Sequence, residues 1–153
     1  MPNAYTQLYV QAVFPVKYRA SLILPEIKDE FFGVIGQEIN KTKCKTLIVN
    51  GVEDHVHLLF GLNPVCAIAD VLKLVKGNSS KWMNDSRFHK TEFHWQSGYG
   101  AFSYSKMEID GLYNYILNQE AHHKKQSFQD EYIEMLKMHG VDYDERYLFH
   151  PLI

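Results

Sequence analysis

Alternating apolar and polar positions at the start of the chain predict a β-strand, and a longer apolar period then predicts a helix. Residues 5–14 alternate, and one side of an extended backbone would carry Leu8, Val10, Ala12 and Phe14. From residue 25 to about residue 41 an apolar side chain recurs every fourth position, after a proline suited to a first helical turn. The chain therefore begins with a strand followed by an amphipathic helix.

The next segment predicts a β-hairpin. Residues 45–62 contain two apolar runs separated by Asn50-Gly51 and a short polar stretch, and Asn-Gly favours a tight hairpin turn. The second run carries two histidines, His55 and His57, at alternating positions. Because successive side chains of a strand point to opposite faces, both imidazoles lie on one face of this strand.

A second helix and a further strand follow the hairpin. The pair Asn63-Pro64 is typical of a helix start, and the apolar spacing continues toward Trp82, although Gly77-Asn78 is expected to weaken the helix midway. An aromatic-rich segment over residues 91–105 is then expected to contain the next strand. Its glycines favour a bulge or a close backbone approach.

This order of elements predicts an α+β fold. Strand, helix, strand, strand, helix, strand is the ferredoxin-like (RRM-like) βαββαβ sandwich, with an antiparallel sheet and both helices on one face. Residues 1–153 are expected to form a single domain, with a core to about residue 104 and a C-terminal extension from about residue 105. In this fold His55 and His57 lie on the face that the two helices leave open.

A third helix is predicted beyond the last strand. Ser105 and a glutamate three residues later have the spacing of a capping box, so the helix is expected over residues 106–124. At about 100° per residue, Tyr113 falls within the apolar stripe of this helix and Tyr115 falls far from it. Gln119 returns almost beneath Tyr115. We therefore interpret Tyr113 as a core residue and Tyr115 as free for another role.

Composition and charge narrow the classes of function. The chain has 153 residues, a formal net charge of −2 and two cysteines, Cys44 and Cys66, without the CxxC spacing of a redox or zinc motif. No stretch approaches a membrane span and no secretory signal is visible, so a cytoplasmic protein with reduced thiols and no membrane partner is expected. Residues 73–107 carry six basic and two acidic side chains, whereas residues 108–153 carry four and nine. A local basic patch is sufficient to grip a nucleic-acid backbone.

Several motifs together resemble the single-tyrosine HUH transposases, the insertion-sequence 200-like enzymes and their repeat-associated relatives. The His-hydrophobe-His signature is present as His55-Val56-His57, and the tyrosine motif as YILNQ, from Tyr115 to Gln119. Further similar stretches are VKYR, GYGAFS and FQDEYIEMLKMHGVDYDERYL. The resemblance covers nearly the whole chain.

The resemblance implies a specific chemistry. His55, His57 and Gln119 would hold a divalent ion, Mg²⁺ or Mn²⁺, and Tyr115 would attack a phosphodiester to leave a 5′-phosphotyrosine and a free 3′-hydroxyl. Such an enzyme cleaves and rejoins single-stranded DNA for transposition. The family also implies hairpin-bearing DNA ends as the partner, and a homodimer whose tyrosine helices complete composite active sites.

Other residues are candidates for contacts with DNA. The expected phosphate contacts are Lys17, Arg19, Lys73, Lys76, Lys81, Arg87 and Lys90. Trp95, Tyr99 and Phe102 are candidates for stacking on unpaired bases, although an aromatic stripe is more often core. His122 lies three residues beyond Gln119 on a similar helix face, which makes it a candidate to approach the ion, but it stays outside the expected ligand set.

Two other classes of function remain open from the residues. One is a single-stranded nucleic-acid-binding module, either domesticated or catalytically retired. The other is a zinc hydrolase that uses His55, His57 and a histidine of the His122-His123 pair, with water as the nucleophile. Replacing Tyr115 separates the three, since only the transposase needs the phenol for chemistry.

Overall fold

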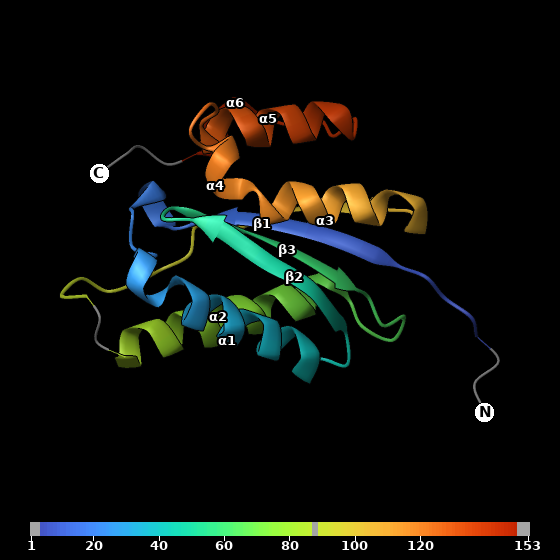
Figure 1. Cartoon of the computed structure of the whole chain (residues 1–153), viewed down its shortest axis with the longest axis horizontal. Coiled ribbons are helices and arrows are strands. Elements are labelled where there is room, and N and C mark those ends of the chain that lie inside the picture. Colours follow the sequence, from blue (N-terminus) through green and yellow to red (C-terminus); the bar gives the residue numbers. More distant parts are fainter. Residues whose placement is uncertain (1–3, 87–88, 150–153) are drawn as a thin grey trace.

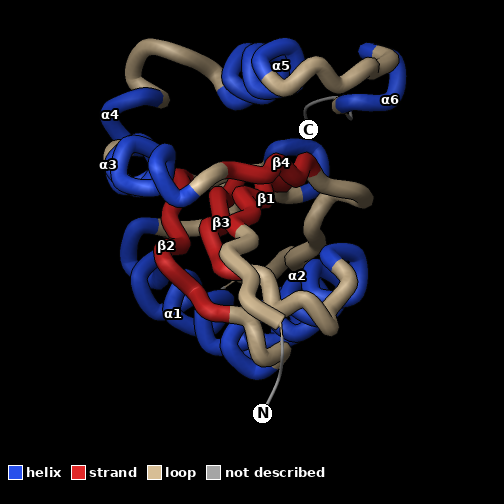
Figure 2. The backbone as a smooth tube through the Cα atoms, turned by 90° about the vertical axis from the view of Figure 1, so that its right-hand side faces the viewer, coloured by secondary structure: helices blue, strands red, loops and turns tan. Residues whose placement is uncertain are grey.

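A β-sheet lies between two layers of helices in the computed structural model, which describes residues 4–86 and 89–149 (Figures 1 and 2). The elements of the first part are β1 (Tyr9–Pro15), the 3₁₀ turn η1 (Lys17–Arg19), α1 (Pro25–Lys41), β2 (Lys45–Val52), β3 (His55–Gly61), α2 (Ile68–Ser86) and β4 (Gly100–Tyr104). The second part contains the 3₁₀ turn η2 (Lys106–Glu108), α3 (Ile109–Leu117), α4 (Gln119–His122), α5 (Phe128–Met138) and α6 (Glu145–Leu148).

The described strands pair antiparallel in the order β2-β3-β1-β4. The register places Asn50 of β2 and Val13 of β1 on either side of His57. Residues directly opposite one another in an antiparallel pair point to the same face, so these three side chains share a surface. The predicted α+β class, with an antiparallel sheet and helices, is confirmed.

Helices α1 and α2 cover one face of the sheet, and the main hydrophobic core lies between them and the strands (Figure 1). Alternation sends Phe14 and Leu58 to this side, where both are fully buried. The rings of Phe31 and Trp95 stack here with centroids 5.8 Å apart, and Trp95 meets Phe14 edge-on at 4.7 Å. This layer fixes the central strands that carry the histidines.

The other face of the sheet is also covered, which corrects the expectation of an open face. Helix α3 packs over β2 and β3 through Leu59, Leu112 and Ile116, whereas α5 packs over β1 and β4 through Phe102 and Tyr132. Figure 2 shows both helices, with α4 and α6, on the side of the sheet opposite α1 and α2. His55 and His57 are consequently buried, with no exposed surface.

The predicted hairpin is confirmed, and its turn lies at residues 53–54 in the short polar stretch, whereas no turn forms at Asn50-Gly51. Both residues belong to β2. A Cβ atom on Gly51 would clash with the backbone of His55 and Val56, so the glycine serves the close approach of β2 to β3. The Asn-Gly signal came from a strand that admits no side chain at this position.

The second helix begins four residues later than expected. The Oδ1 atom of Asn63 accepts a hydrogen bond from the Val65 N–H at 3.0 Å, so Asn63 caps a local turn, and α2 starts only at Ile68. Gly77-Asn78 lies within α2 without interrupting it. Cys44 and Cys66 are both free thiols, as expected. No helix among the described residues is both long and apolar enough to cross a membrane.

The continuous third helix expected over residues 106–124 is wrong. The chain forms η2 and α3, breaks at Asn118 (φ −97°, ψ 23°) and resumes as the short helix α4. Ile109, Leu112 and Ile116 form the buried face of α3, as the apolar spacing predicts, and Tyr113 lies at the edge of this face. Tyr113 is therefore 38% exposed and is not a core residue, whereas Tyr115 is half-buried.

The carboxyl end of α3 is tied to the sheet by Asn50. Its Nδ2 atom donates to the carbonyl oxygens of Ile116 and Leu117, at 2.9 and 3.1 Å. These carbonyls belong to the last turn of the helix, where partners inside the helix are lacking. Because Asn50 lies directly opposite His57, this contact fixes the tyrosine helix relative to the histidine strand.

We expect Asn50→Asp to lower the free energy of unfolding by about 1–2 kcal/mol, because a carboxylate cannot donate to the two carbonyls. Urea denaturation at pH 7 measures the change. Asn40→Asp is the matched control, since Asn40 accepts a hydrogen bond from the Thr46 N–H through Oδ1, which aspartate retains. Equal losses in the two variants would contradict the capping role of Asn50.

The start of the tyrosine helix should respond to acid. Glu108 accepts hydrogen bonds from the backbone N–H and the hydroxyl of Ser105, at 2.9 and 3.1 Å, and these bonds lower the pKa of Glu108 from 4.5. A carboxyl whose pKa is lower in the folded state stabilises the protein above 4.5 and loses that contribution as the pH falls through the folded value.

Glu108→Ala is therefore expected to lower the urea midpoint at pH 7. The difference from wild type should shrink in acid, below the ordinary pKa of the carboxyl. Urea titrations at several pH values test this, with Glu30→Ala on the exposed surface of α1 as the control. A difference that stays constant down to strongly acidic pH would refute the assignment.

Candidate metal and nucleophile site

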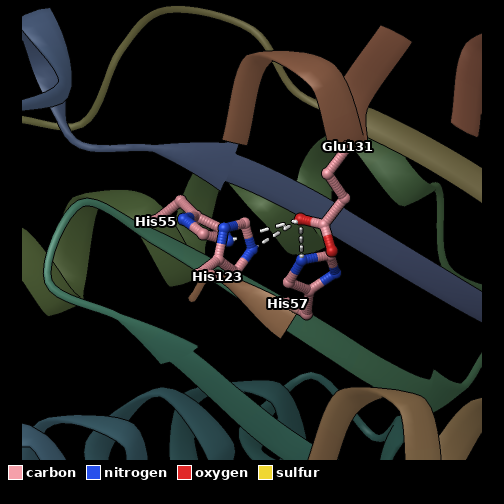
Figure 3. Close-up of side chains that lie close together, drawn as sticks. All are labelled: His55, His57, His123 and Glu131. Atoms are coloured by element: carbon pink, nitrogen blue, oxygen red, sulfur yellow. Dashed lines mark hydrogen bonds and ion pairs between the residues drawn. The ribbon is translucent and has the colours of Figure 1, made fainter. Parts of the chain in front are cut away.

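Three imidazoles and one carboxylate converge on the face of the sheet that α3 to α5 cover (Figure 3). His55 and His57 come from β3, His123 follows α4, and Glu131 lies on α5. One ligand atom from each residue lies within 4.8 Å of the others. The Oε1 atom of Glu131 lies 2.9 Å from Nε2 of His57, 3.1 Å from Nε2 of His123 and 3.4 Å from Nε2 of His55.

The two strand histidines are oriented from behind by their other ring nitrogens. His55 donates from Nδ1 to Oδ1 of Asp54 at 2.7 Å, and His57 accepts at Nδ1 from the Gln11 amide at 3.0 Å. Both rings therefore present Nε2 to the centre of the cluster. The donation from His55 to Asp54 is the kind of outer hydrogen bond that orients a metal-binding histidine. His57 gains the same bond when its proton lies on Nδ1 and the Gln11 amide turns its oxygen toward it.

Gln119 closes the cluster from α4. Its Nε2 atom donates to Oε2 of Glu131 at 3.0 Å, so its Oε1 atom is turned toward Nε2 of His55, at 3.2 Å. Because Nδ1 of His55 holds its proton toward Asp54, the second nitrogen of a neutral His55 carries a lone pair. Nε2 of His55 and Oε1 of Gln119 are then two acceptor atoms that face each other, and a proton or a metal cation between them would satisfy both.

The protonation states follow from these contacts. Burial opposes a charge on His55, but the hydrogen bonds to Asp54 and Glu131 outweigh it and raise the pKa of His55. For His57, burial outweighs the attraction of Glu131 and lowers the pKa. Burial alone would raise the pKa of Glu131, yet the surrounding imidazoles hold it well below its usual value. A buried, ionised carboxylate thus faces the imidazoles and attracts cations.

Tyr115 lies beside this cluster, and its hydroxyl donates a hydrogen bond to Oε2 of Glu131. Its ring centroid is 6.2 Å from that of His57 and 4.4 Å from that of His122. Burial and the Glu131 carboxylate raise the pKa of Tyr115. The phenol is therefore protonated, and the group best placed to accept its proton already contacts it.

A cavity of about 470 Å³ opens next to the tyrosine, between α3 and α5. Its walls include Gln11, Tyr104, Leu112, Tyr115, His122, Glu131 and Met135. The tyrosine side of the cluster is therefore accessible to a ligand, whereas the histidine side is sealed by the sheet.

The structure brings together the residues expected at the site, namely His55, His57, Tyr115 and Gln119, and adds His123 and Glu131. Of the histidine pair, His123 faces the cluster and His122 packs on Tyr115. Glu131 could have been identified as unusual from the sequence. It occupies the apolar stripe of α5 among Phe128, Tyr132, Met135 and Leu136, where a carboxylate is unusual unless it has buried partners.

The basic candidates are scattered. Lys17 and Arg19 follow β1 at the end of the sheet where His55 lies, and Lys73 and Lys81 are exposed on α2, on the other side of the sheet. Exposed Lys90 lies in the loop after α2, and Arg87 lies outside the described residues. Of the aromatic candidates, Trp95 and Phe102 are buried, and Tyr99 is 39% exposed.

Two of these basic residues have distinctive surroundings. Lys76 donates to the carbonyl oxygens of Gln96 and Gly98, at 2.7 and 2.6 Å, and burial lowers its pKa to about 8. Arg19 and the preceding Tyr18 have φ values of 52° and 62°, in the left-handed region that non-glycine residues seldom adopt. The strained turn η1 holds the VKYR motif beside the end of the sheet.

A family model described as IS200-like transposase matches residues 4–119. This range contains the His-hydrophobe-His strand and extends through Tyr115 to Gln119. The chain belongs to the IS200-like transposase family. The resemblance stated from the sequence motifs is thereby confirmed.

A transposase is also among the individual proteins that this chain resembles in sequence. Over 77 residues, which are 50% of this chain and 55% of the relative, it is 30% identical to the ISDra2 transposase TnpA of Deinococcus radiodurans. The chain thus matches about half the length of that relative.

Solved structures share the fold. A crystal structure assigned as a transposase from Deinococcus radiodurans R1 has a TM-score of 0.63 and 22% identity, covering 78% of this chain and 95% of that one. A REP-associated tyrosine transposase, solved with a REP hairpin bound, has a TM-score of 0.58 and 13% identity, covering 80% and 73%.

The positions of Lys17 and Lys76 predict opposite outcomes for their substitution. If Lys17 contacts a phosphate, Lys17→Ala should make the dependence of log K on log salt for single-stranded DNA shallower by about 0.7 and leave stability unchanged. Lys76→Met should instead lower the free energy of unfolding by about 1–3 kcal/mol, because two carbonyls lose a charged donor. Fluorescence anisotropy over a salt series and urea denaturation measure the two quantities. The reverse pattern would make Lys76 the DNA contact.

Proposed function

We propose that this chain cleaves and rejoins single-stranded DNA through a covalent phosphotyrosine, as a transposase that moves DNA segments. The observation that carries the proposal is the position of Tyr115, whose hydroxyl contacts Glu131 at the edge of the histidine cluster and borders the cavity. Membership of the IS200-like transposase family supports it.

The proposed reaction is a reversible exchange of phosphate esters. The Oη atom of Tyr115 attacks the phosphorus, its proton passes to Oε2 of Glu131, and the bond from phosphorus to the 3′ oxygen breaks. The leaving 3′ oxygen takes up a proton from water and Glu131 returns its proton to solvent, so the products are a 5′-phosphotyrosine and a free 3′-hydroxyl. Because the ester energy is kept in the tyrosine linkage, a 3′-hydroxyl can reverse the step at a new junction.

His55, His57 and Gln119 would hold a divalent ion, Mg²⁺ or Mn²⁺, in this reaction. The fit rests on the acceptor atoms that face one another, Nε2 of His55 and Oε1 of Gln119, together with the nearby carboxylate of Glu131. When bound, the ion neutralises charge on the scissile phosphate and orients it. The protein contributes the fixed ring orientations through Asp54 and Gln11.

The substrate and assembly proposed here follow the family. Single-stranded DNA with hairpins near the element ends is the expected partner, and the REP hairpin bound to the related tyrosine transposase supports it. Within this one chain, Tyr115 lies at the chain's own histidines. Exchange of tyrosine helices in a homodimer stays a prediction, as do the cytoplasmic location and the single domain over residues 1–153.

The order of the strands supports a specific fold class within the α+β proteins. We assign the core to the ferredoxin-like class on the order β2-β3-β1-β4 with α1 and α2 on one face. In this arrangement β1 and β3 are the central strands, and β3 holds the metal-binding pair.

Tyr115→Phe is expected to abolish covalent capture of DNA. Purified protein is mixed with labelled single-stranded DNA from its genomic flanks and Mg²⁺ or Mn²⁺, and the products are separated on a denaturing gel. Wild type should form a metal-dependent adduct that the variant lacks, because the phenol oxygen makes the bond. Tyr113→Phe, at an exposed tyrosine two residues away on α3, is the matched control and should retain the adduct.

The other results separate the alternatives. Cleavage undiminished in Tyr115→Phe would make water the nucleophile, as in a zinc hydrolase. Binding of the cognate strand by wild type, with neither adduct nor cleavage in either metal, would indicate a nucleic-acid-binding module.

A further inference from the structure

We propose that His123 and Glu131 are metal ligands, so that the site binds a first-row transition-metal ion through three imidazoles and one carboxylate in preference to Mg²⁺. This deepens the proposed function, on which the catalytic use of the ion rests. Both residues lie beyond Gln119, where the match to the family model ends. The second half of the site therefore comes from the C-terminal extension.

The geometry of His123 favours a ligand over a surface histidine. Its Nε2 atom lies 3.1 Å from Oε1 of Glu131 and 3.0 Å from Oε1 of Gln119, and its ring centroid lies 4.4 Å from that of His55. The side chain is 10% exposed. Its neighbour His122 points away from the cluster toward Tyr115, so the two adjacent histidines are clearly distinguished by their surroundings.

Glu131 is placed to serve two groups at once. Oε1 faces the imidazoles, whereas Oε2 accepts from Gln119 and from the hydroxyl of Tyr115. As a ligand through Oε1, the same carboxylate would connect the ion to the tyrosine. Gln119 then acts by orienting Glu131, in addition to any direct contact that it makes.

The donor atoms determine which ion fits. Three neutral imidazole nitrogens suit zinc, cobalt, iron and nickel, and the carboxylate also suits manganese. Mg²⁺ prefers oxygen ligands, keeps several waters and is held by one or two carboxylates. A cluster that offers three Nε2 atoms and one Oε1 atom, all within 4.8 Å of one another, matches the transition metals better.

The distribution of charge agrees with this assignment. The carboxylates of Glu131 and Asp54 lie at the cluster, and Asp54 reaches it through Nδ1 of His55. Together they balance a divalent cation. Without one, the protein holds a nearly buried carboxylate, 2% exposed, against three imidazoles whose protons must supply the compensation.

The test is metal binding by the full-length chain, measured without DNA. Co²⁺ and Mg²⁺ are titrated separately into metal-free wild type, His123→Ala, Glu131→Gln and His122→Ala by calorimetry and, for Co²⁺, visible absorption. We expect wild type to bind Co²⁺ far more tightly than Mg²⁺. His123→Ala and Glu131→Gln should each weaken Co²⁺ binding by about tenfold or more, and each should change the Co²⁺ spectrum because the ligand set changes.

His122→Ala is the matched control and should bind Co²⁺ within about twofold of wild type, because its ring packs on Tyr115 outside the cluster. Circular dichroism in the presence of a chelator shows whether each variant is folded. The His123 side chain is 10% exposed, so its removal is tolerated more easily, and His123→Ala keeps the test valid if Glu131→Gln fails to fold. Unchanged Co²⁺ affinity and spectrum in His123→Ala would overturn its assignment as a ligand. Mg²⁺ affinity equal to that for Co²⁺ would overturn the metal preference.

Failure of this inference is distinguishable from failure of the proposed function. Tyr115→Phe should bind Co²⁺ with at least wild-type affinity, since the phenol is not a ligand. If the expected binding pattern is found but wild type forms no adduct with cognate DNA, the metal site stands and the nuclease assignment falls. If wild type forms the adduct but His123→Ala and Glu131→Gln bind Co²⁺ normally, the nuclease assignment stands and the assignment of these two residues as metal ligands falls.

Discussion

The buried carboxylate of Glu131 holds the C-terminal helices in their positions around the site. It accepts hydrogen bonds from two imidazoles, an amide and a phenol, which come from β3, α3, α4 and the turn after α4. Each of these donors would lose a buried partner if α5 were displaced, and the carboxylate would lose them all. The packing of Tyr132 against Gly100 of β4 holds α5 from the other side, because a Cβ at Gly100 would lie 2.6 Å from the ring of Tyr132. The polar contacts and the close packing therefore fix the same helix.

The two faces of the sheet have different roles. The face toward α1 and α2 is filled with large apolar side chains. Their close packing gives the rigid support that holds the side chains of the site in position. The opposite face combines apolar patches under α3 and α5 with the polar cluster between them. A strict period of two in β3 serves both, since Val56, Leu58 and Phe60 enter the core while His55 and His57 enter the site. Asn50, on the neighbouring strand, extends the polar face to the end of the tyrosine helix.

The sequence was most informative where one physical signal dominates. Period-two alternation located β1 and β3, and the apolar spacing after Pro25 gave α1 with its observed ends. It was misleading where tertiary contacts overrule local preference. Asn50-Gly51 reads as a turn, but the asparagine caps a helix more than sixty residues later and the glycine admits a neighbouring strand. The break at Asn118 carries no proline or glycine to announce it. Glu131 was missed because its partners are remote in sequence, although a glutamate on an apolar stripe is visible, and His123 entered only through the histidine pair of the zinc-hydrolase alternative.

The break at Asn118 has a kinematic consequence. In a continuous helix Tyr115 and Gln119 would be neighbours on one rigid rod, separated by little more than one turn, and any motion of one would carry the other. Here they belong to separate segments, α3 and α4, joined by a single non-helical residue. Asn50 anchors the first segment to the sheet, whereas the second is anchored through Gln119 to Glu131. Because each segment has its own anchor, the position of Tyr115 is set by the contact of α3 with the sheet, and the position of Gln119 is set separately by its contact with α5.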